Sequence, residues 1–179
     1  MILETKRLLL RPFCESDAED VYDYARDPQV GPVAGWPPHK SVEESRQTIQ
    51  TVFHSPHVFA MVDKSSGRVI GSVGLVNRHY GDPPLPDDEM GYALGAAYWG
   101  RGLATEAALT VMEYSFTEHG LQTLWCGHYD GNERSRRVIE KCGFRYRFSC
   151  WENVELMNER RKSHFYALTK REWEAHRRF

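Results

Sequence analysis

The stretch YWGRGLATEA, residues 98–107, constrains the fold of this chain more than any other segment. Gly100 and Gly102 come directly before an alanine-rich run that is typical of a helix. Glycines allow backbone dihedral angles that other residues avoid, and they let the chain approach a ligand closely. The first N–H groups of a helix have no acceptor within the helix, and the helix dipole favours anions there. The stretch therefore predicts a turn into a helix N-terminus that suits phosphate.

This stretch matches neither of two familiar phosphate-binding motifs, the P-loop and GxGxxG. It lacks the lysine of a P-loop, and Thr105 stands where a GxGxxG motif has its third glycine. Thr105 adds a hydroxyl to the first helical turn, and Arg101 adds a cation. A glycine-rich helix start that binds nothing is equally compatible with this stretch alone.

A second segment, GNERSRRVIEKCGF at residues 131–144, has the form of a complete helix. Asn132 is a natural N-cap, and Gly143 is placed to close a Schellman motif. Ser135 puts a hydroxyl at the N-terminal end of an apolar stripe, either as a functional group or as a serine bonded to the cap. The predicted buried face consists of Ser135, Val138, Ile139 and Cys142.

The bulk composition predicts one compact domain over residues 1–179. Hydrophobic residues make up 41% and charged residues 27%, which is ordinary for a globular protein. A net charge of −2 gives no reason to expect nucleic acid or a membrane as partner. The N-terminal apolar run is too short for a signal peptide, and no segment nears the roughly 20 apolar residues of a membrane span, so we expect a cytoplasmic protein.

Charge is unevenly distributed along the chain. Acidic residues outnumber basic ones in the first hundred residues, and the reverse holds in the remainder. The second part is the better host for an anionic ligand, although scatter over a solvated surface explains the asymmetry equally well.

The four cysteines, at positions 14, 126, 142 and 150, have neither CxxC nor zinc-finger spacing. We expect buried, reduced thiols and no metal site. Cys126 and Cys142 are poor candidates for a nucleophile, because neither has a histidine positioned beside it in the sequence.

Hydrophobic periodicity and turn residues predict alternating strands and helices. A Gly/Pro-rich loop is expected at 31–41, and Gly91 inside the strand 89–94 is typical of a bulge. Capping boxes predict helices that begin at Ser16, with Glu19, and at Ser41, with Glu44. Further helices are expected from the glycine turn to His119, over 133–142, and after 169. The predicted strands are 7–13, 58–63, 69–77, 89–94, 123–129, 144–152 and 164–169, which indicates an α/β or α+β fold with a mixed sheet.

The pairing of EMGYALGAAYWGRGLATEA with GNERSRRVIEKCGF resembles the GNAT N-acetyltransferase superfamily, and within it the ribosomal-protein alanine acetyltransferases. The opening TKRLLLRPF, the DPQV at 27–30 and the spacing of Trp36 and Ser41 are also similar to that branch. The resemblance implies a mostly antiparallel sheet of six to seven strands, about four flanking helices and a splay at the strand 89–94. One departure is Trp99, which stands where the superfamily's pyrophosphate motif has Gln or Arg, while Gly102 and Ala104 match.

The resemblance implies acetyl-CoA as co-substrate, without a metal. The turn from Trp99 to Thr105 would bind its pyrophosphate through backbone N–H groups, and the splayed strand would pair with the pantetheine amides. A backbone N–H near Tyr92 or Ala93 would polarise the thioester carbonyl. The residues implied to bind acetyl-CoA are Tyr92, Ala93, Leu94, Trp99, Gly100, Arg101, Gly102, Leu103, Ala104, Thr105, Asn132, Ser135, Arg136 and Arg137.

The implied reaction is direct attack of a primary amine on the thioester. Ser135 would protonate the leaving thiolate, and Glu89 would act as general base, directly or through water. An exposed carboxylate at a strand end is the alternative for Glu89. A non-catalytic acyl-CoA-binding module and a nucleotide-binding domain of another kind are alternatives for the whole chain.

The acceptor amine is a small molecule or a protein N-terminus on this interpretation. The resemblance places Trp36 beside the acceptor cleft, and Asp87 and Asp88 are candidates to attract a cationic amine, unless they are merely solvated loop acids. The sequence leaves a homodimer open.

Overall fold

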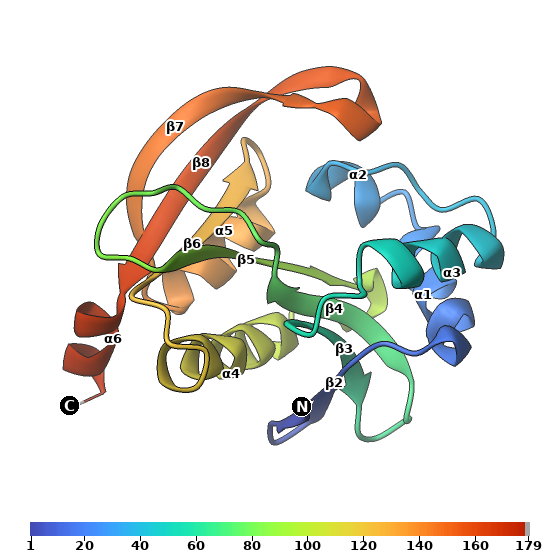
Figure 1. Cartoon of the computed structure of the whole chain (residues 1–179). Helices are drawn as coiled ribbons and strands as arrows, with labels where there is room; N and C mark the ends of the chain where they lie inside the picture. The colour runs from blue at the N-terminus through green and yellow to red at the C-terminus, as the bar shows by residue number, and fades with distance from the viewer. Residues whose placement is uncertain (178–179) are drawn as a thin grey trace.

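The computed structural model describes residues 1–177, which form a central sheet with helices on both faces (Figure 1). Within these residues the sheet has eight strands in the order β1-β2-β3-β4-β5-β6-β8-β7. Neighbouring strands are antiparallel, except that β5 and β6 are parallel. The strands are β1 Leu3–Glu4, β2 Leu8–Arg11, β3 Val58–Asp63, β4 Val69–Leu75, β5 Asp87–Leu94, β6 Thr123–Tyr129, β7 Arg145–Val154 and β8 Glu159–Thr169.

Six α-helices lie within the same residues, two more than the sequence resemblance implies. They are α1 Ala18–Ala25, α2 Gly31–Ala34, α3 Val42–Thr51, α4 Leu103–Thr117, α5 Glu133–Lys141 and α6 Lys170–His176. The sheet likewise has one or two strands more than expected, because the two-residue β1 is too short to give a periodic signal. The architecture of a mixed, mostly antiparallel α/β sheet is confirmed.

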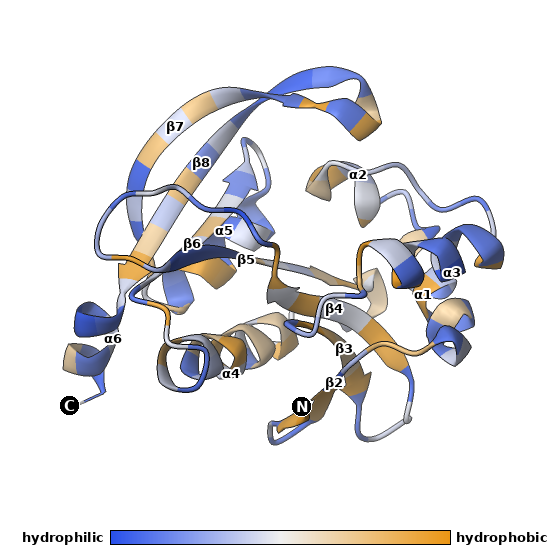
Figure 2. Cartoon of the chain, in the orientation of Figure 1, coloured by the Kyte–Doolittle hydropathy of each residue, from blue (hydrophilic) through white to orange (hydrophobic). Residues whose placement is uncertain are grey.

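The sheet is buried on both sides in its middle. In β3, alternate residues belong to different cores: Phe59 and Met61 pack with α4, whereas Ala60 and Val62 pack with α1 and α3. Strands buried on both faces read as continuous apolar runs, as β3 and β4 do in Figure 2. The arch of β7 and β8 alternates between polar and apolar residues instead.

The splay of the sheet at β5 is confirmed. The parallel pairing of β5 with β6 ends at the pair Glu89 and Trp125, although both strands continue beyond it. From Met90 onward, the edge of β5 that faces β6 has no strand partner within the described residues. Pairing of β5 with β4 runs in regular register through Gly91, so the bulge expected at this glycine is not present.

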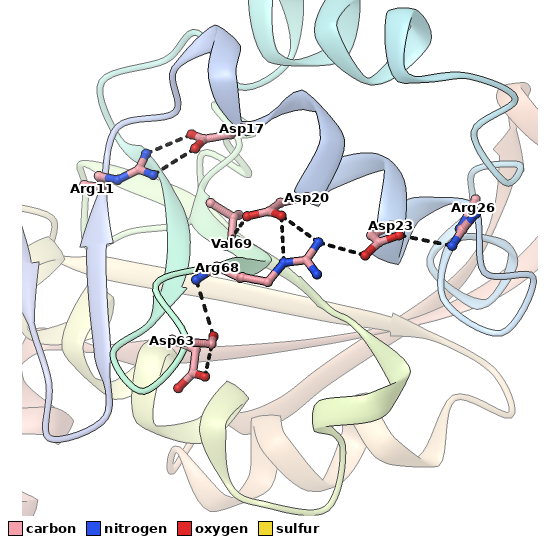
Figure 3. A network of polar contacts seen from close by, with 9 residues as sticks. Arg11, Asp17, Asp20, Asp23, Arg26, Asp63, Arg68 and Val69 are labelled. Carbon is pink, nitrogen blue, oxygen red and sulfur yellow. Dashed lines mark hydrogen bonds and ion pairs between the residues drawn. The ribbon is translucent and has the colours of Figure 1, made fainter.

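The start of the first helix differs from the capping box predicted at Ser16. A short 3-10 turn, Glu15–Asp17, precedes α1, and Asp17 rather than Ser16 accepts the Cys14 backbone N–H, at 2.9 Å. Asp17 also forms a bidentate pair with Arg11 of β2 (Figure 3). The hydrogen bonds and charge of Arg11 outweigh burial and lower the pKa of Asp17.

Helix α1 is held on the sheet by a second polar contact. Asp20 accepts a hydrogen bond from the backbone N–H of Val69 at 2.8 Å, and the Arg68 guanidinium reaches both Asp20 and Asp23 (Figure 3). The predicted N-caps of two later helices are confirmed: Ser41 accepts from the Glu44 N–H, and Asn132 accepts from the Ser135 N–H.

The segment 31–41, expected as a loop, contains the one-turn helix α2. Pro32 lies at its first turn, where a proline costs no hydrogen bond, and Gly35 ends it with a φ of 96°. A side chain at position 35 would collide with Tyr129, since a Cβ there would lie 2.9 Å from the ring. Gly35 thus lets α2 close against β6.

Candidate functional site

A cavity of about 430 Å³ lies where β5 and β6 separate. Its walls come from β5, β6, α2, the N-terminal turn of α4 and one face of α5. Thirteen of the predicted site residues line it: Glu89, Tyr92, Ala93, Leu94, Trp99, Gly100, Gly102, Leu103, Ala104, Thr105, Asn132, Ser135 and Arg137. Four others, Trp36, Asp88, Arg101 and Arg136, are not part of its lining.

The glycine turn before α4 has the backbone conformation that the sequence predicts. Gly100 and Gly102 have φ values of 74° and 75°, which is left-handed backbone. Gly102 is the N-cap of α4, and no side chain caps this helix. Consequently the N–H groups of Leu103, Ala104 and Thr105 have no acceptor within residues 1–177. They form an open helix terminus beside the cavity, of a kind that suits an anion.

Residues near the chain's N-terminus fix this turn in place. Arg7 donates to the Arg101 carbonyl at 2.9 Å and pairs with Glu106 in the first turn of α4 at 2.7 Å. Thr5 donates to the same carboxylate at 2.6 Å. The TKR segment at 5–7 therefore supports the glycine turn.

Trp99 connects the turn to both sides of the splay. Its indole N–H donates to the Leu94 carbonyl at the end of β5, at 2.8 Å. The Arg134 guanidinium of α5 lies over the Trp99 ring, 4.0 Å from its centroid. Such a cation–π contact contributes roughly 0.5–2 kcal/mol. Trp99 thus holds the Arg134 guanidinium beside the glycine turn.

Tyr92 and Ser135 meet across the open part of the sheet. The Tyr92 hydroxyl lies 2.8 Å from the Ser135 Oγ and donates to the Ser135 carbonyl at 3.1 Å. Burial raises the pKa of Tyr92 well above its usual value, so this tyrosine is a neutral hydrogen-bonding group. The Ser135 backbone N–H donates to the Asn132 side chain, so this serine is bonded to the helix cap, which was one of its two predicted roles. Ser135 also lines the cavity, as the other predicted role, that of a functional group, requires.

Helix α2 is tied to the far side of the cavity. The Asn132 amide donates to the Val33 carbonyl at 3.3 Å, and the Arg161 guanidinium of β8 donates to the Pro32 carbonyl at 2.5 Å. Asn132 thereby caps α5 and holds α2 with one side chain. Val30, Val33 and Ala34 line this part of the cavity.

Glu89 lies in the cavity wall with only 14% of its side chain exposed. The Tyr80 hydroxyl donates to its Oε2 at 2.5 Å, and the Arg78 Nε lies 3.5 Å away. Burial outweighs both partners and raises the pKa of this carboxyl group. Glu89 is therefore a buried carboxylate and not the exposed strand-end carboxylate that the sequence left open as an alternative. Its raised pKa suits a general base.

Asp87 and Asp88 are both buried, so neither is a solvated loop acid. Asp88 Oδ1 accepts from the backbone N–H groups of Arg78 and Glu89, at 2.9 and 2.7 Å. Asp87 accepts from the N–H groups of Tyr80 and Gly81. Both carboxylates hold the loop that carries Arg78 and Tyr80.

Trp36 is partly buried and packs against the core cluster that includes residues of α1 and α3, and it does not line the cavity. Its ring covers Gly31, where an added Cβ would lie 2.5 Å from the indole. Trp36 therefore supports α2 from behind.

Two residues predicted to contact phosphate, Arg101 and Arg136, do not line the cavity. Arg101 is exposed and lies 5.7 Å from the centroid of the Tyr98 ring. Arg136 pairs with Glu133 at 2.8 Å and with Glu140 at 3.8 Å on the outer side of α5.

Three charged cavity residues escaped the sequence reasoning: Arg78, Lys141 and Glu152. Lys141 shares the helical face of Arg134 and Arg137, so a helical projection would have found it. Arg78 and Glu152 lie in a loop and an edge strand far apart in the sequence, and they pair at 2.5 Å. No local pattern signals such a contact.

All four cysteines were expected to be buried, and two of them are. Cys126 and Cys142 are buried, and burial raises the pKa of Cys142 to about 12, which makes it unreactive. Cys14 and Cys150, however, are exposed. Residues 1–177 contain no cluster of three or more His, Cys, Asp or Glu side chains suited to a metal ion. Nor do they contain a helix with the length and apolar character of a membrane span.

Comparison with known proteins agrees with the family resemblance found in the sequence. Residues 7–145 match the acetyltransferase (GNAT) domain family. YnaD of Bacillus subtilis, described as an uncharacterized N-acetyltransferase, is 27% identical over 97% of this chain and 99% of its own length.

Two solved structures share the fold over nearly the whole chain. A GNAT-family acetyltransferase from Bacillus anthracis has a TM-score of 0.83 and 24% identity, covering 96% of this chain and 99% of that one. A ribosomal-protein-S5-alanine acetyltransferase from Vibrio fischeri has a TM-score of 0.76 and 21% identity, covering 97% and 98%.

The family match spans the glycine turn, the splayed strand and helix α5, which together build the cavity. This chain belongs to the GNAT acetyltransferase family and is an N-acetyltransferase.

Proposed function

We propose that this enzyme transfers the acetyl group of acetyl-CoA to a primary amine by direct attack on the thioester. The observation that carries the proposal is the single cavity that runs from the uncapped N-terminus of α4, along the unpaired edge of β5, to Glu89. An anion-binding turn and a free strand edge suit the pyrophosphate and the amide-containing arm of CoA.

Bound acetyl-CoA supplies the thioester whose carbon–sulfur bond breaks. The bound ammonium group first loses one proton to solvent, which frees the lone pair of its nitrogen. Glu89 accepts the second proton that this nitrogen loses as the new carbon–nitrogen bond forms. A backbone N–H of β5 near Tyr92 or Ala93 donates to the carbonyl oxygen as negative charge develops there. Ser135 gives its hydroxyl proton to the departing sulfur and regains one from solvent. Tyr92 holds the Ser135 hydroxyl in place.

The acceptor enters, on this proposal, from the side of Glu89 and α2. Two carboxylates, Glu89 and Glu152, flank a single arginine there, which leaves a negative balance that favours a protonated amine. A protein N-terminus and a small-molecule amine both meet this requirement. We expect no part for Asp88 or Trp36 in direct contact with the acceptor, since both are engaged in supporting the walls.

The test is release of free CoA from acetyl-CoA across a panel of amines and N-terminal peptides. Glu89→Gln should lower kcat/KM by about 10²-fold or more, because it removes the proton acceptor. Ser135→Ala should lower kcat more than it raises KM, and Tyr92 retains the Ser135 carbonyl as a partner. Glu174→Gln, on the exposed surface of α6, is the matched control and should leave both constants unchanged.

An enzyme that binds acetyl-CoA but acetylates no member of the panel would favour the non-catalytic acyl-CoA-binding alternative. Unchanged rates in both Glu89→Gln and Ser135→Ala would remove the two catalytic assignments while leaving acetyl transfer intact.

A further inference from the structure

The part of the cavity beside Glu89 is lined by one face of β6 and β8. Tyr129 of β6 lies directly opposite Ser163 of β8, and Phe165 follows two residues along β8, so all three face the same side of the sheet. The Arg78 guanidinium lies 5.0 Å from the centroid of the Phe165 ring and its Nε lies 3.5 Å from Glu89. We call the part of the cavity lined by α2, Glu89 and these residues of β6 and β8 the acceptor pocket.

The acceptor pocket has one surplus negative charge. Glu89 and Glu152 are the only acidic side chains that line the cavity within residues 1–177. Both pair with the guanidinium of Arg78, at 3.5 and 2.5 Å. Two carboxylates against one guanidinium leave a single charge to balance an incoming ammonium group.

Acidic side chains next to these walls are engaged elsewhere. Asp130, which follows Tyr129 in the chain, lies 2.8 Å from the His164 Nε2, and Glu159 pairs with Arg161. Neither acid lines the cavity. The pocket therefore offers a counter-charge to one ammonium group and none to a second.

Helix α2 contributes only apolar side chains to the pocket. Val33 and Ala34 line the cavity, as does Val30 just before the helix. The helix closes against Tyr129, because a Cβ at Gly35 would lie 2.9 Å from that ring. A pocket walled by aliphatic and aromatic groups, with few polar ones, favours a ligand with an apolar body.

Two neutral hydroxyl groups are also found in these walls. Burial and the charge of Glu152 raise the pKa of Tyr129, so its hydroxyl stays protonated. The Ser163 Oγ is buried and has no hydrogen-bond partner within residues 1–177. Neutral hydroxyls do not replace the water around a second ammonium group, since a charge removed from water needs a counter-charge.

We infer that the acceptor is a monoamine whose amino group is attached to an apolar body, and that diamines and polyamines are poor acceptors. The inference rests on the proposed acetyl transfer. The ammonium group lies beside Glu89 and Glu152 before it loses its protons, and the apolar body packs against α2, Tyr129 and Phe165. A small-molecule amine and a peptide N-terminus with an apolar first residue both fit this description.

The experiment compares acceptors that differ by one positive charge. Pentylamine and 1,5-diaminopentane form one pair, and peptides that begin with norleucine or with lysine form the other. In each pair the second member adds one ammonium group to an otherwise identical chain. With the whole wild-type enzyme at saturating acetyl-CoA, kcat/KM should be at least about 10-fold higher for the first member, because the added charge loses its water without gaining a counter-charge. The pair that is acetylated distinguishes a small-molecule acceptor from a peptide.

Val33→Glu places a carboxylate in the acceptor pocket, at a side chain that is 40% exposed and tolerates a charge. The bond from Asn132 uses the Val33 carbonyl, so the substitution leaves α2 attached to α5. The variant should raise kcat/KM for the member with two ammonium groups about 10-fold, and so bring the preference to within about 2-fold. Val52→Glu is the matched control: it makes the same change at an exposed valine after α3, outside the cavity, and should keep the wild-type preference.

Equal acetylation of both members of a pair by the wild-type enzyme would overturn the inference and leave acetyl transfer intact. A Val33→Glu enzyme with native circular dichroism and the wild-type preference would do the same, and the wild-type comparison decides the matter if that variant does not fold. If another amine of the wider panel is the only acceptor, a polyamine contradicts the inference and an apolar monoamine supports it. Turnover of no amine at all would reject the proposed function and the inference together.

Discussion

Arg78 links more parts of the site than any single residue named above. Its guanidinium pairs with Glu89 of β5 and Glu152 of β7, and it lies 5.0 Å from the centroid of the Phe165 ring of β8. Its backbone N–H donates to Asp88. Arg78 is a positioning residue: it acts on the proposed reaction through the ionisation of Glu89.

Arg78→Gln should move the acid limb of the pH profile of kcat/KM to higher pH. The pKa of Glu89 is raised by burial and partly restored by the charge of Arg78, so removing that charge raises the pKa further. Only ionised Glu89 accepts a proton. The loss of kcat/KM should therefore be larger at pH 6 than at pH 9.

Glu152→Gln tests the same argument, because it should shift the acid limb of the kcat/KM profile in the opposite direction. The negative charge of Glu152 raises the pKa of Glu89, so its removal should move the acid limb to lower pH. Shifts in the same direction for both variants would show that Glu89 does not set the acid limb.

At the residue scale, the sequence predicted best where a residue's role is set by its own helix or turn. Gly100, Gly102, Asn132 and Ser135 belong to short motifs, and the structure places all of them in the cavity wall. Arg78 and Glu152 come from separate segments, so only the folded chain brings them together. The resemblance implied that Arg136 contacts phosphate, but its side chain pairs with Glu133 and Glu140 and does not line the cavity.

At the element scale, α2 is the part of the site that the sequence did not reveal. Its GPVA sequence has loop composition, and four residues are too few for a helix to be stable alone. The carbonyl groups of Pro32 and Val33 are satisfied by Arg161 and Asn132 from elsewhere in the chain. The helix therefore depends on tertiary contacts.

Asn132→Ala should affect stability and amine binding together. Loss of an N-cap costs about 1 kcal/mol, and loss of the bond to Val33 loosens α2 beside the proposed acceptor site. We expect the free energy of unfolding in urea to fall by about that amount and the KM for the amine to rise several-fold.

Ser41→Ala removes the N-cap of α3, whose side-chain bond to the Glu44 N–H is away from the cavity, and serves as the control. It should lower the free energy of unfolding by a similar amount, about 1 kcal/mol, and leave the KM unchanged. Equal effects of both variants on KM would show that α2 does not shape the acceptor site.

At the scale of the whole molecule, one sheet joins all the elements that build the site. Strand β5 pairs with β4 on one edge and with β6 on the other, so the N-terminal and C-terminal strands belong to the same sheet. The largest core cluster includes residues of β2, α4 and β8 alike. If the chain consisted of two independently folding parts, the residues of this one core cluster would belong to both parts.

Residues 1–179 should accordingly unfold as a single cooperative unit. Urea unfolding followed by tryptophan fluorescence and by far-UV circular dichroism should give coincident midpoints. The five tryptophans lie in different parts of the chain, from Trp36 to Trp173, so they report on both ends of the sheet. Two separated midpoints would show that the chain contains more than one domain.

The sequence by itself determined the order of the strands and helices apart from β1 and α2, the glycine turn at the start of α4, the capped helix α5 and the resemblance to the family. These features follow from local spacing: dihedral freedom at Gly102, a side-chain acceptor at Asn132, apolar periodicity along each element. Tertiary structure alone decided how Arg78 is shared between Glu89 and Glu152, and that Asp88 and Trp36 support the walls. Such roles depend on contacts between residues far apart in the chain, and short-range sequence patterns carry no information about them.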